Sequence, residues 1–454
     1  MKTMKSKLTL RTAALIFAAA AATGLSGCSD IGFGEKVLLR PPRATGDKAA
    51  IQTAIEGQAG GSYTLKYPQK GQYRSAITMF DIAGGEYALA FYSTDSDSKL
   101  NVSVIAGKDE QWDCIGSFSN KGTGVDRVIF KDVNNDGKED IIVGWNNYAT
   151  GRNTLSIYSV ENNAVREMTV DETYNEMMLA DITGDKSEDL VIITLSTAQS
   201  GSSLLVMQYS DQEKRPIGKY AVELDPEVKE FTGVFYDKID SGVNGIILDG
   251  EKAGSMRTTQ VVYFDKADNE LKNPLLTVSE NDTYSNPTTR KDVISARDFD
   301  SDGIVEVPVI TPLSASPKDK AGAVCSLTSW KQLRTNDGSL QTKMNTVINY
   351  NDGYYFIMPD AWTGNVTALS DPAKREVSYY VWNSKTGSVG DKILSIERFG
   401  ASDIEQAKKD GYVPLGLELS DGTDAVIAAK LFKTNTSDEL NLDQSELEKC
   451  IKAL

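Results

Sequence analysis

Oxygen-bearing side chains at alternate positions of a short loop are the feature of this sequence that most directly indicates chemistry. Positions 1, 3, 5 and 9 of the loop hold Asp132, Asn134, Asp136 and Asp140. Gly137 at position 6 permits the positive φ that such a tight turn needs. Calcium takes six to eight oxygen ligands, and the backbone carbonyl of position 7, here Lys138, can supply one more. The spacing therefore predicts a Ca²⁺ site in this loop.

The same spacing occurs twice more. One copy carries its ligands at Asp298, Asp300, Asp302, Ile304 (through its carbonyl) and Glu306. The other has Asp181, Thr183, Asp185, Ser187 (through its carbonyl) and Asp189. The second copy has Lys186 where the glycine is expected, and Thr183 is a weaker ligand than a carboxylate. Reduced versions begin at Asp81, which keeps only the first ligand, and at Asp237, which keeps the first ligand and a glycine.

The residues that follow each loop indicate which elements position it. An EF-hand has a glutamate at position 12 and continues into a helix, whereas position 12 here is Val143, preceded by Ile141 and Ile142. Such β-branched runs predict that the loops join strand to strand. Asp, Asn and Gly also form ordinary turns, and for one loop that alternative stays open. Three copies in the same phase with a following strand favour metal binding.

The repeat itself predicts the architecture. Its five starts, at residues 81, 132, 181, 237 and 298, lie about 50–60 residues apart, which accommodates four short strands and their turns. The sequence therefore predicts a mainly β protein, with a β-propeller of about five blades over residues 62–350; six or seven blades remain possible. The run Tyr63–Tyr67 is expected to be an extra strand that closes the ring.

These repeats resemble the FG-GAP or VCBS repeats of integrin-α-type β-propellers found in bacterial surface proteins. In that family calcium lies in the hairpin loop between the first two strands of a blade. The resemblance implies that the loops starting at Asp132, Asp181 and Asp298 bind calcium, while those at Asp81 and Asp237 depart from the pattern. It implies a fold rather than one function, because such propellers serve adhesion, carbohydrate binding and enzyme support.

The N-terminus predicts export and lipid anchoring. Residues 1–27 combine four basic residues, an apolar run over 13–22 and the sequence Leu-Ser-Gly before Cys28, which resembles a bacterial lipobox. This implies cleavage before Cys28 and acylation of its thiol; the alternative is an ordinary signal peptide. Residues 28–61 are expected to form a tether, with a short helix over 48–56 that has Asp47 as N-cap.

The rhythm of the sequence changes after residue 350. Residues 351–454 are expected to form a smaller α+β domain, with strands over 377–382, 393–396, 413–419 and 425–431. A capping box at Ser402–Glu405 predicts a short helix, and a helical stripe is expected from Leu440 to Leu454. The alternative is a continuation of the propeller.

Composition excludes several classes of function. The 454-residue chain has a net charge of −16, so we expect no binding to nucleic acid, and contact with the membrane only through the N-terminal lipid. The absence of histidine excludes histidine-based zinc sites and histidine-dependent nucleophilic catalysis. Unpaired thiols are favoured over a Cys114–Cys325 bridge. Trp145 is expected in the core, with a sugar platform as the alternative.

Together these patterns predict a lipoprotein on the extracytoplasmic face of the cell membrane. A calcium-stabilised propeller would act as a binding or scaffold module for an unknown protein or glycan of the cell envelope. The alternative is an exported polysaccharide lyase or hydrolase built on the propeller. The first is favoured because no catalytic residues are identified, and the carboxylates fall mainly in the repeat loops.

Overall fold

The computed structural model describes residues 46–95, 99–109, 111–281, 283–314 and 323–454. The predicted signal peptide and the predicted lipidation at Cys28 lie outside the described residues. Within the described part of the chain, no helix is long and apolar enough to cross a membrane.

The described chain is mainly β, in agreement with the sequence. Its first four large sheets are antiparallel and follow the chain in order. Sheet 1 contains β1 (Tyr63–Leu65), β2 (Ile77–Ile82), β3 (Gly85–Thr94), β4 (Leu100–Lys108) and β5 (Gln111–Asn120). Sheet 2 contains β6 (Gly124–Lys131), β7 (Asp140–Asn146), β8 (Asn153–Glu161), β9 (Ala164–Met168) and β10 (Thr173–Tyr174). Sheet 3 contains β11 (Glu176–Ala180), β12 (Asp189–Thr194), β13 (Ser203–Ser210) and β14 (Arg215–Glu223). Sheet 4 contains β15 (Val228–Asp240), β16 (Val243–Lys252), β17 (Met256–Asp265) and β18 (Glu270–Lys272).

Two further large sheets complete the described chain. Sheet 5 contains β21 (Glu306–Pro312), β23 (Ser326–Leu333), β24 (Leu340–Asn349), β25 (Tyr354–Ile357) and β31 (Ile451–Ala453). Sheet 6 contains β22 (Ala323–Val324), β26 (Val366–Asp371), β27 (Glu376–Asn383), β28 (Ser388–Phe399), β30 (Val426–Leu431) and β29 (Val413–Pro414). The smaller elements are β19 (Thr277–Val278), β20 (Tyr284–Ser285), η1 (Ala253–Ser255), η2 (Asp360–Trp362) and η3 (Asp438–Leu440). The helices are α3 (Asp47–Ala59), α4 (Ile404–Lys409) and α5 (Gln444–Cys450).

Each sheet packs its apolar side chains against the next sheet along the chain. Five buried clusters each contain residues of two successive sheets: Leu89 and Val143, Ile142 and Ile192, Ile193 and Ile246, Ile247 and Val307, and Phe356 and Tyr379. Strand β7 is buried along its whole length because neighbouring sheets cover both of its faces. Stability in such an array is mainly a sum of nearest-neighbour contacts.

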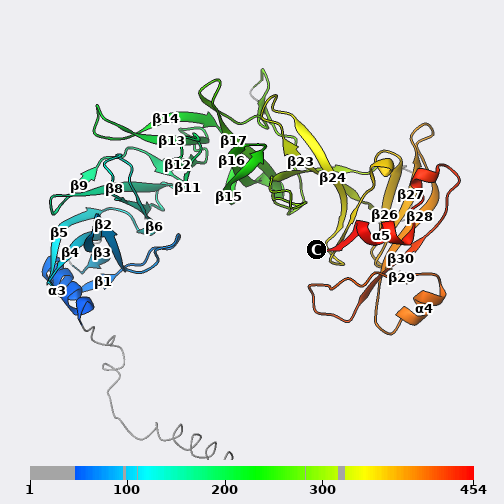
Figure 1. Cartoon of the computed structure of the whole chain (residues 1–454), viewed down its shortest axis with the longest axis horizontal. Coiled ribbons are helices and arrows are strands. Elements are labelled where there is room, and N and C mark those ends of the chain that lie inside the picture. The colour runs from blue at the N-terminus through cyan, green and yellow to red at the C-terminus, as the bar shows by residue number, and fades with distance from the viewer. Residues whose placement is uncertain (1–45, 96–98, 110, 282, 315–322) are drawn as a thin grey trace, which may run out of the picture.

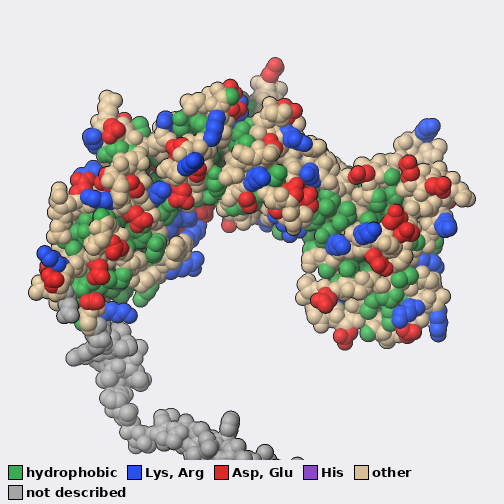
Figure 2. All heavy atoms as spheres, in the orientation of Figure 1, with side chains coloured by type: hydrophobic (Ala, Val, Ile, Leu, Met, Phe, Trp, Pro, Cys, Tyr) green, Lys and Arg blue, Asp and Glu red, His purple; other side chains and the backbone are tan. Residues whose placement is uncertain are grey.

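The sheets follow an arch, and the predicted closed ring is absent from the described residues (Figure 1). The hollow between the two ends of the arch is also open in the space-filling view of this face (Figure 2). The strand expected to close the ring, β1, instead pairs with β3 of sheet 1, with Tyr63 opposite Thr94. Helix α3 buries Ile51 and Ile55 on that sheet and so covers an apolar face of the first repeat.

The helix over 47–59 belongs to the folded body, although the sequence placed it in the tether. Asp47 does not act as the predicted N-cap, because Gly46 occupies that position. The Asp47 carboxylate instead accepts a hydrogen bond from Trp112 Nε1 at 3.2 Å, which joins the helix to β5. Burial of the apolar helix face therefore determines how this segment is held.

The C-terminal region differs from the sequence expectation in its details. The expected boundary at residue 350 falls between β24 and β25, which are neighbours in sheet 5. Helix α4 forms as predicted but without a capping-box hydrogen bond, whereas α5 has a capping box from Asp443 and Glu446. The predicted helical stripe ends at Cys450, because Ile451 pairs with Phe356 and begins β31.

Two expectations about buried side chains are confirmed. Trp145 is fully buried and donates from Nε1 to Ser156 Oγ at 3.2 Å, so it is a core residue rather than a sugar platform. Cys114, Cys325 and Cys450 are free thiols. Burial raises the pKa of Cys325 to about 12, so this thiol stays protonated at neutral pH.

Candidate metal loops

Each of the five predicted repeat starts leads into a strand of a different sheet, but only three of them begin a long loop. The loop over 132–139 joins β6 to β7, the loop over 181–188 joins β11 to β12, and the loop over 298–305 leads into β21. The start at Asp81 lies within β2, which turns at Ala83 and Gly84, with φ values of 51° and 81°, into β3. The start at Asp237 lies within β15, which turns at residues 241–242 into β16. These two tight hairpins lack the long loop that the ligand spacing requires.

The loops at 132 and 298 share one hydrogen-bond framework. The position-5 amide donates to the carboxylate of position 1, at 3.3 Å in Asp136–Asp132 and 3.1 Å in Asp302–Asp298. It also donates to the side chain of position 3, at 2.9 Å to Asn134 and 3.1 Å to Asp300. The position-6 amide donates to the position-1 carboxylate at 2.9 Å in both loops. These amides draw the side chains of positions 1 and 3 into the concave side of each loop.

The third loop keeps most of this framework in spite of its divergent sequence. The amides of Asp185 and Lys186 donate to the Asp181 carboxylate at 3.0 and 3.1 Å. The backbone at positions 4 and 6 is left-handed in all three loops. The φ values are 60° at Asn135 and 84° at Gly137, 69° at Gly184 and 74° at Lys186, and 64° at Ser301 and 82° at Gly303. Lys186 therefore adopts the conformation that glycine adopts elsewhere, while the glycine of this loop has moved to position 4.

Position 7 is tied to position 5 in every loop. The backbone amides of Lys138, Ser187 and Ile304 donate to Asp136, Asp185 and Asp302 at 2.9, 2.8 and 2.9 Å. These residues were predicted to act only through their carbonyls. Their unrelated side chains are consistent with that role, because the shared contact is made by the backbone.

The carboxylate at position 9 is buried beneath each loop. Asp140, Asp189 and Glu306 are 1%, 7% and 0% exposed. Burial, followed by smaller effects that include the neighbouring carboxylates Asp136 and Asp132, raises the pKa of Asp140 to about 6. Burial likewise raises the pKa of Asp189 and of Glu306. A buried carboxylate close to other carboxylates favours a bound cation, which offsets their mutual repulsion.

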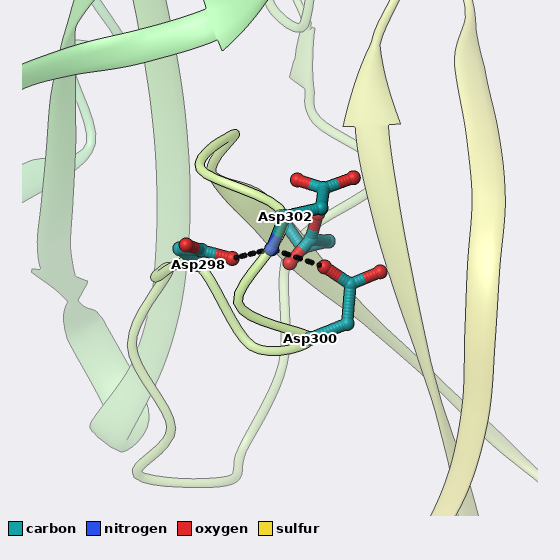
Figure 3. A group of neighbouring side chains, drawn as sticks. Asp298, Asp300 and Asp302 are labelled. Carbon is teal, nitrogen blue, oxygen red and sulfur yellow. Dashed lines mark hydrogen bonds between the residues drawn. The ribbon is translucent and has the colours of Figure 1, made fainter.

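The loop at 298 brings four carboxylates together. One oxygen from each of Asp298, Asp300, Asp302 and Glu306 lies within 4.8 Å of the others. Figure 3 shows the first two of these carboxylates on either side of the Asp302 amide, to which both are hydrogen-bonded. Oxygen ligands about 2.3–2.6 Å from a calcium ion are separated by about 5 Å or less, so this set fits the ion. All four donors are hard oxygens, which calcium prefers over softer ligands.

A residue on the following strand supports each position-9 carboxylate, and the sequence analysis missed these residues. Gln332 pairs with Glu306 across the sheet and donates from Nε2 to Glu306 Oε1 at 2.7 Å and to Asp302 Oδ2 at 2.8 Å. Ser159 and Gln208 hydrogen-bond the Asp140 and Asp189 carboxylates, which offsets part of the pKa increase caused by burial. A polar residue opposite position 9 in the next strand is the signal that could have revealed them.

In the loop at 181 the position-3 side chain contacts the buried carboxylate, as Asn134 does at 132, where its Nδ2 donates to Asp140 Oδ1 at 3.4 Å. Thr183 Oγ1 donates to Asp189 Oδ2 at 3.0 Å, so the hydroxyl is turned onto the buried carboxylate. A cavity of about 160 Å³ is lined by Asp185 and Asp189 of this loop and by Asp132 of the neighbouring loop. Ser187 also lines this cavity, whereas Asp181 and Thr183 are not among its lining residues. Among the described residues, only the loop at 298 brings three or more carboxylates within 4.8 Å of one another.

Comparisons with known proteins give no family assignment. No protein-family model matches the sequence, and the search of curated proteins finds no match. Structural similarity is found to Sqt1 of Saccharomyces cerevisiae, at 10% identity over 80% of this chain and 86% of that chain, with a TM-score of 0.29. The Dos1 propeller is similar at 13% identity over 81% and 80%, with a TM-score of 0.27. An exo-β-1,3-galactanase of Phanerochaete chrysosporium is similar at 9% identity over 86% and 91%, with a TM-score of 0.26. TM-scores this low support no inference about function.

Proposed function

We propose that this protein is a lipid-anchored binding or scaffold module on the extracytoplasmic face of the cell membrane, and that calcium stiffens its sheets. Its repeats would be FG-GAP/VCBS-like units arranged along an open arch. Such an arrangement presents an extended surface to a protein or glycan of the cell envelope, as other linear repeat arrays do. The lipid at Cys28 would hold this surface close to the membrane.

The convergence of oxygens at 298–306 is the observation that supports this proposal most strongly. Asp298, Asp300, Asp302 and Glu306 would hold a calcium ion, with the Ile304 carbonyl as a further ligand. The same backbone framework at 132–140 would hold a second ion through Asp132, Asn134, Asp136 and Asp140. The loop at 181–189 would hold a third, weaker ion. A bound ion would link the loop to the buried carboxylate that begins the following strand and so rigidify the hairpin.

A thermal melt in millimolar calcium and then in chelator tests the metal part of this proposal. A ligand present at a hundred times its dissociation constant stabilises the folded state by about 2.7 kcal/mol per site. We expect a higher melting temperature in calcium, with the increase reduced in Asp136→Ala and in Asp302→Ala. Equal melting temperatures in calcium and chelator would show that the loops are only turns.

Labelling with a fatty-acid analogue in a bacterial host tests the anchor. The wild-type protein should incorporate the label and fractionate with membranes, whereas Cys28→Ala should do neither. Unlabelled wild-type protein released in soluble form would contradict the anchoring proposal while leaving the metal loops untouched. Capture from envelope extract, with an unrelated propeller protein as control, then tests binding.

A further inference from the structure

A groove of about 630 Å³ lies beside the loop at 181–189, and turns from three sheets line it. We call it the turn groove. Sheet 3 contributes Asp181 and Gly184, and sheet 4 contributes Tyr236 and the β17–β18 turn. Thr335 and Asn336, which follow β23 of sheet 5, form the remaining wall. Its volume is in the range of small-molecule binding pockets.

Hydrogen bonds fasten the walls of the turn groove to one another. Lys266 Nζ donates to the Gly184 carbonyl at 2.9 Å, and this contact joins sheet 4 to sheet 3. Tyr263 Oη donates to the Thr335 carbonyl at 3.0 Å, which joins sheet 4 to sheet 5. The backbone amide and the hydroxyl of Thr335 both donate to Asp240 Oδ2 at 2.8 Å. The groove is therefore largely preorganised, so a ligand would lose little free energy in ordering it.

The sheet 3 wall is also held by an aromatic side chain that lines the groove. Tyr236 Oη donates to the backbone carbonyl of Asp181, the first residue of the loop. Burial raises the pKa of Tyr236, so the phenol stays protonated and keeps its donor. The half-buried ring of Phe264 lies in the same lining. Aromatic surface in the lining is therefore combined with a fixed polar frame.

The exposed rim supplies groups that both donate and accept hydrogen bonds. Asn244 and Asn336 are exposed and carry amides, and Asp265 and Lys266 add an acceptor and a donor. A sugar ring presents hydroxyls on its edge and C–H groups on its faces, so it matches polar groups placed beside aromatic rings. We propose that the turn groove binds a segment of about two units of an uncharged glycan.

Two other ligand classes fit the turn groove less well. An extended peptide gains most of its affinity by adding to a free strand edge. Most of the lining here consists of turns and loops, and the lining residues of β16 and β17 belong to inner strands of sheet 4. An anionic glycan would be opposed by the net charge of −16, and the lining cation Lys266 already donates to the Gly184 carbonyl. Uncharged sugars avoid both difficulties. This inference rests on the proposed binding function and specifies the ligand and its place.

Binding to an immobilised panel of neutral di- to tetrasaccharides of glucose, galactose and mannose tests the proposal, with isothermal titration of the best soluble member. The variants are Asn336→Ala and Phe264→Ala, compared with Tyr148→Ala. Tyr148 is an aromatic residue that is 70% exposed in the β7–β8 connection, outside the groove lining. The melting temperature of each variant shows whether it is folded. Asn336→Ala removes only an exposed side chain, so it remains informative if Phe264→Ala does not fold.

We expect saturable binding by the wild type, binding about tenfold weaker in Asn336→Ala, and unchanged binding in Tyr148→Ala. Absence of binding to the whole panel would overturn the proposal, and so would binding that Asn336→Ala leaves unchanged. The calcium melt gives an independent result. A calcium shift without sugar binding would reject the turn groove alone, and sugar binding without a calcium shift would reject only the metal part of the proposed function.

Discussion

The loops at 298 and 181 have nearly the same backbone but different capacities for a cation. Both place the position-5 and position-6 amides on the first carboxylate, and both have left-handed residues at positions 4 and 6. At 298 four carboxylates meet, whereas at 181 the Thr183 hydroxyl donates a hydrogen bond to the Asp189 carboxylate. The turn framework therefore persists without a full ligand set. Metal binding must therefore be judged from the side-chain oxygens rather than from the loop shape.

Removal of a carboxylate from the stronger loop should have the largest effect. Asp302→Ala takes one of the four oxygens from the 298 cluster and should abolish the calcium-dependent stabilisation of that site, about 2.7 kcal/mol at saturating calcium. Chemical denaturation in calcium and in chelator measures the change. Asp185→Ala in the weaker loop should cause a smaller loss, and an equal or larger loss there would reverse the ranking of the two loops.

Loss of the glutamine side chain that supports the position-9 carboxylate should have the next largest effect. Gln332→Ala removes two hydrogen bonds that orient Asp302 and Glu306, so calcium affinity should fall about tenfold or more. Calcium titration followed by calorimetry measures this. Gln208→Ala is the matched variant at the 181 loop and should weaken binding less. Unchanged affinity in Gln332→Ala would show that the carboxylates are held without it.

A carboxylate added at position 3 of the 181 loop should make its calcium binding more like that of the 298 loop. Thr183→Asp replaces a donor by a carboxylate close to Asp189, so it should destabilise the calcium-free protein by about 1 kcal/mol through repulsion. Calcium should reverse this loss, and affinity at the site should rise about tenfold. Thr183→Ser keeps the hydroxyl and serves as the control. A Thr183→Asp variant that calcium does not rescue would place the ion elsewhere.

The smallest effect on stability should come from substitutions at the left-handed position 6 of the loops. Lys186 has a φ of 74°, so Lys186→Gly should stabilise the protein by about 1 kcal/mol. At the equivalent position, φ is 82° at Gly303, and Gly303→Ala should destabilise by a similar amount. Melting temperatures measured in chelator report this backbone effect without any contribution from metal binding. Two changes of the same sign would mean that contacts of the Lys186 side chain outweigh its backbone strain.

Local patterns were sufficient to predict much of the fold and of the candidate loops. The alternation of apolar runs with Asp-rich turns located the sheets, and each of the five repeat starts leads into a strand of a different sheet. The loops at 132, 181 and 298 formed where ligand spacing placed them, whereas those at 81 and 237 are hairpin turns. Turn geometry and the pairing of strands in a hairpin depend on residues that are close in sequence, so short stretches of sequence are enough to predict them.

Strand content, loop positions and the candidate ligands could be predicted from the sequence, because each depends on residues that are neighbours in the chain. The tertiary fold leaves the arch open, because α3 covers sheet 1 and β1 pairs within that sheet. It also placed Gln332 on the 298 site and assembled the turn groove from three sheets. These features join segments that are far apart in sequence, so their contacts depend on which strands pair and on how the sheets pack.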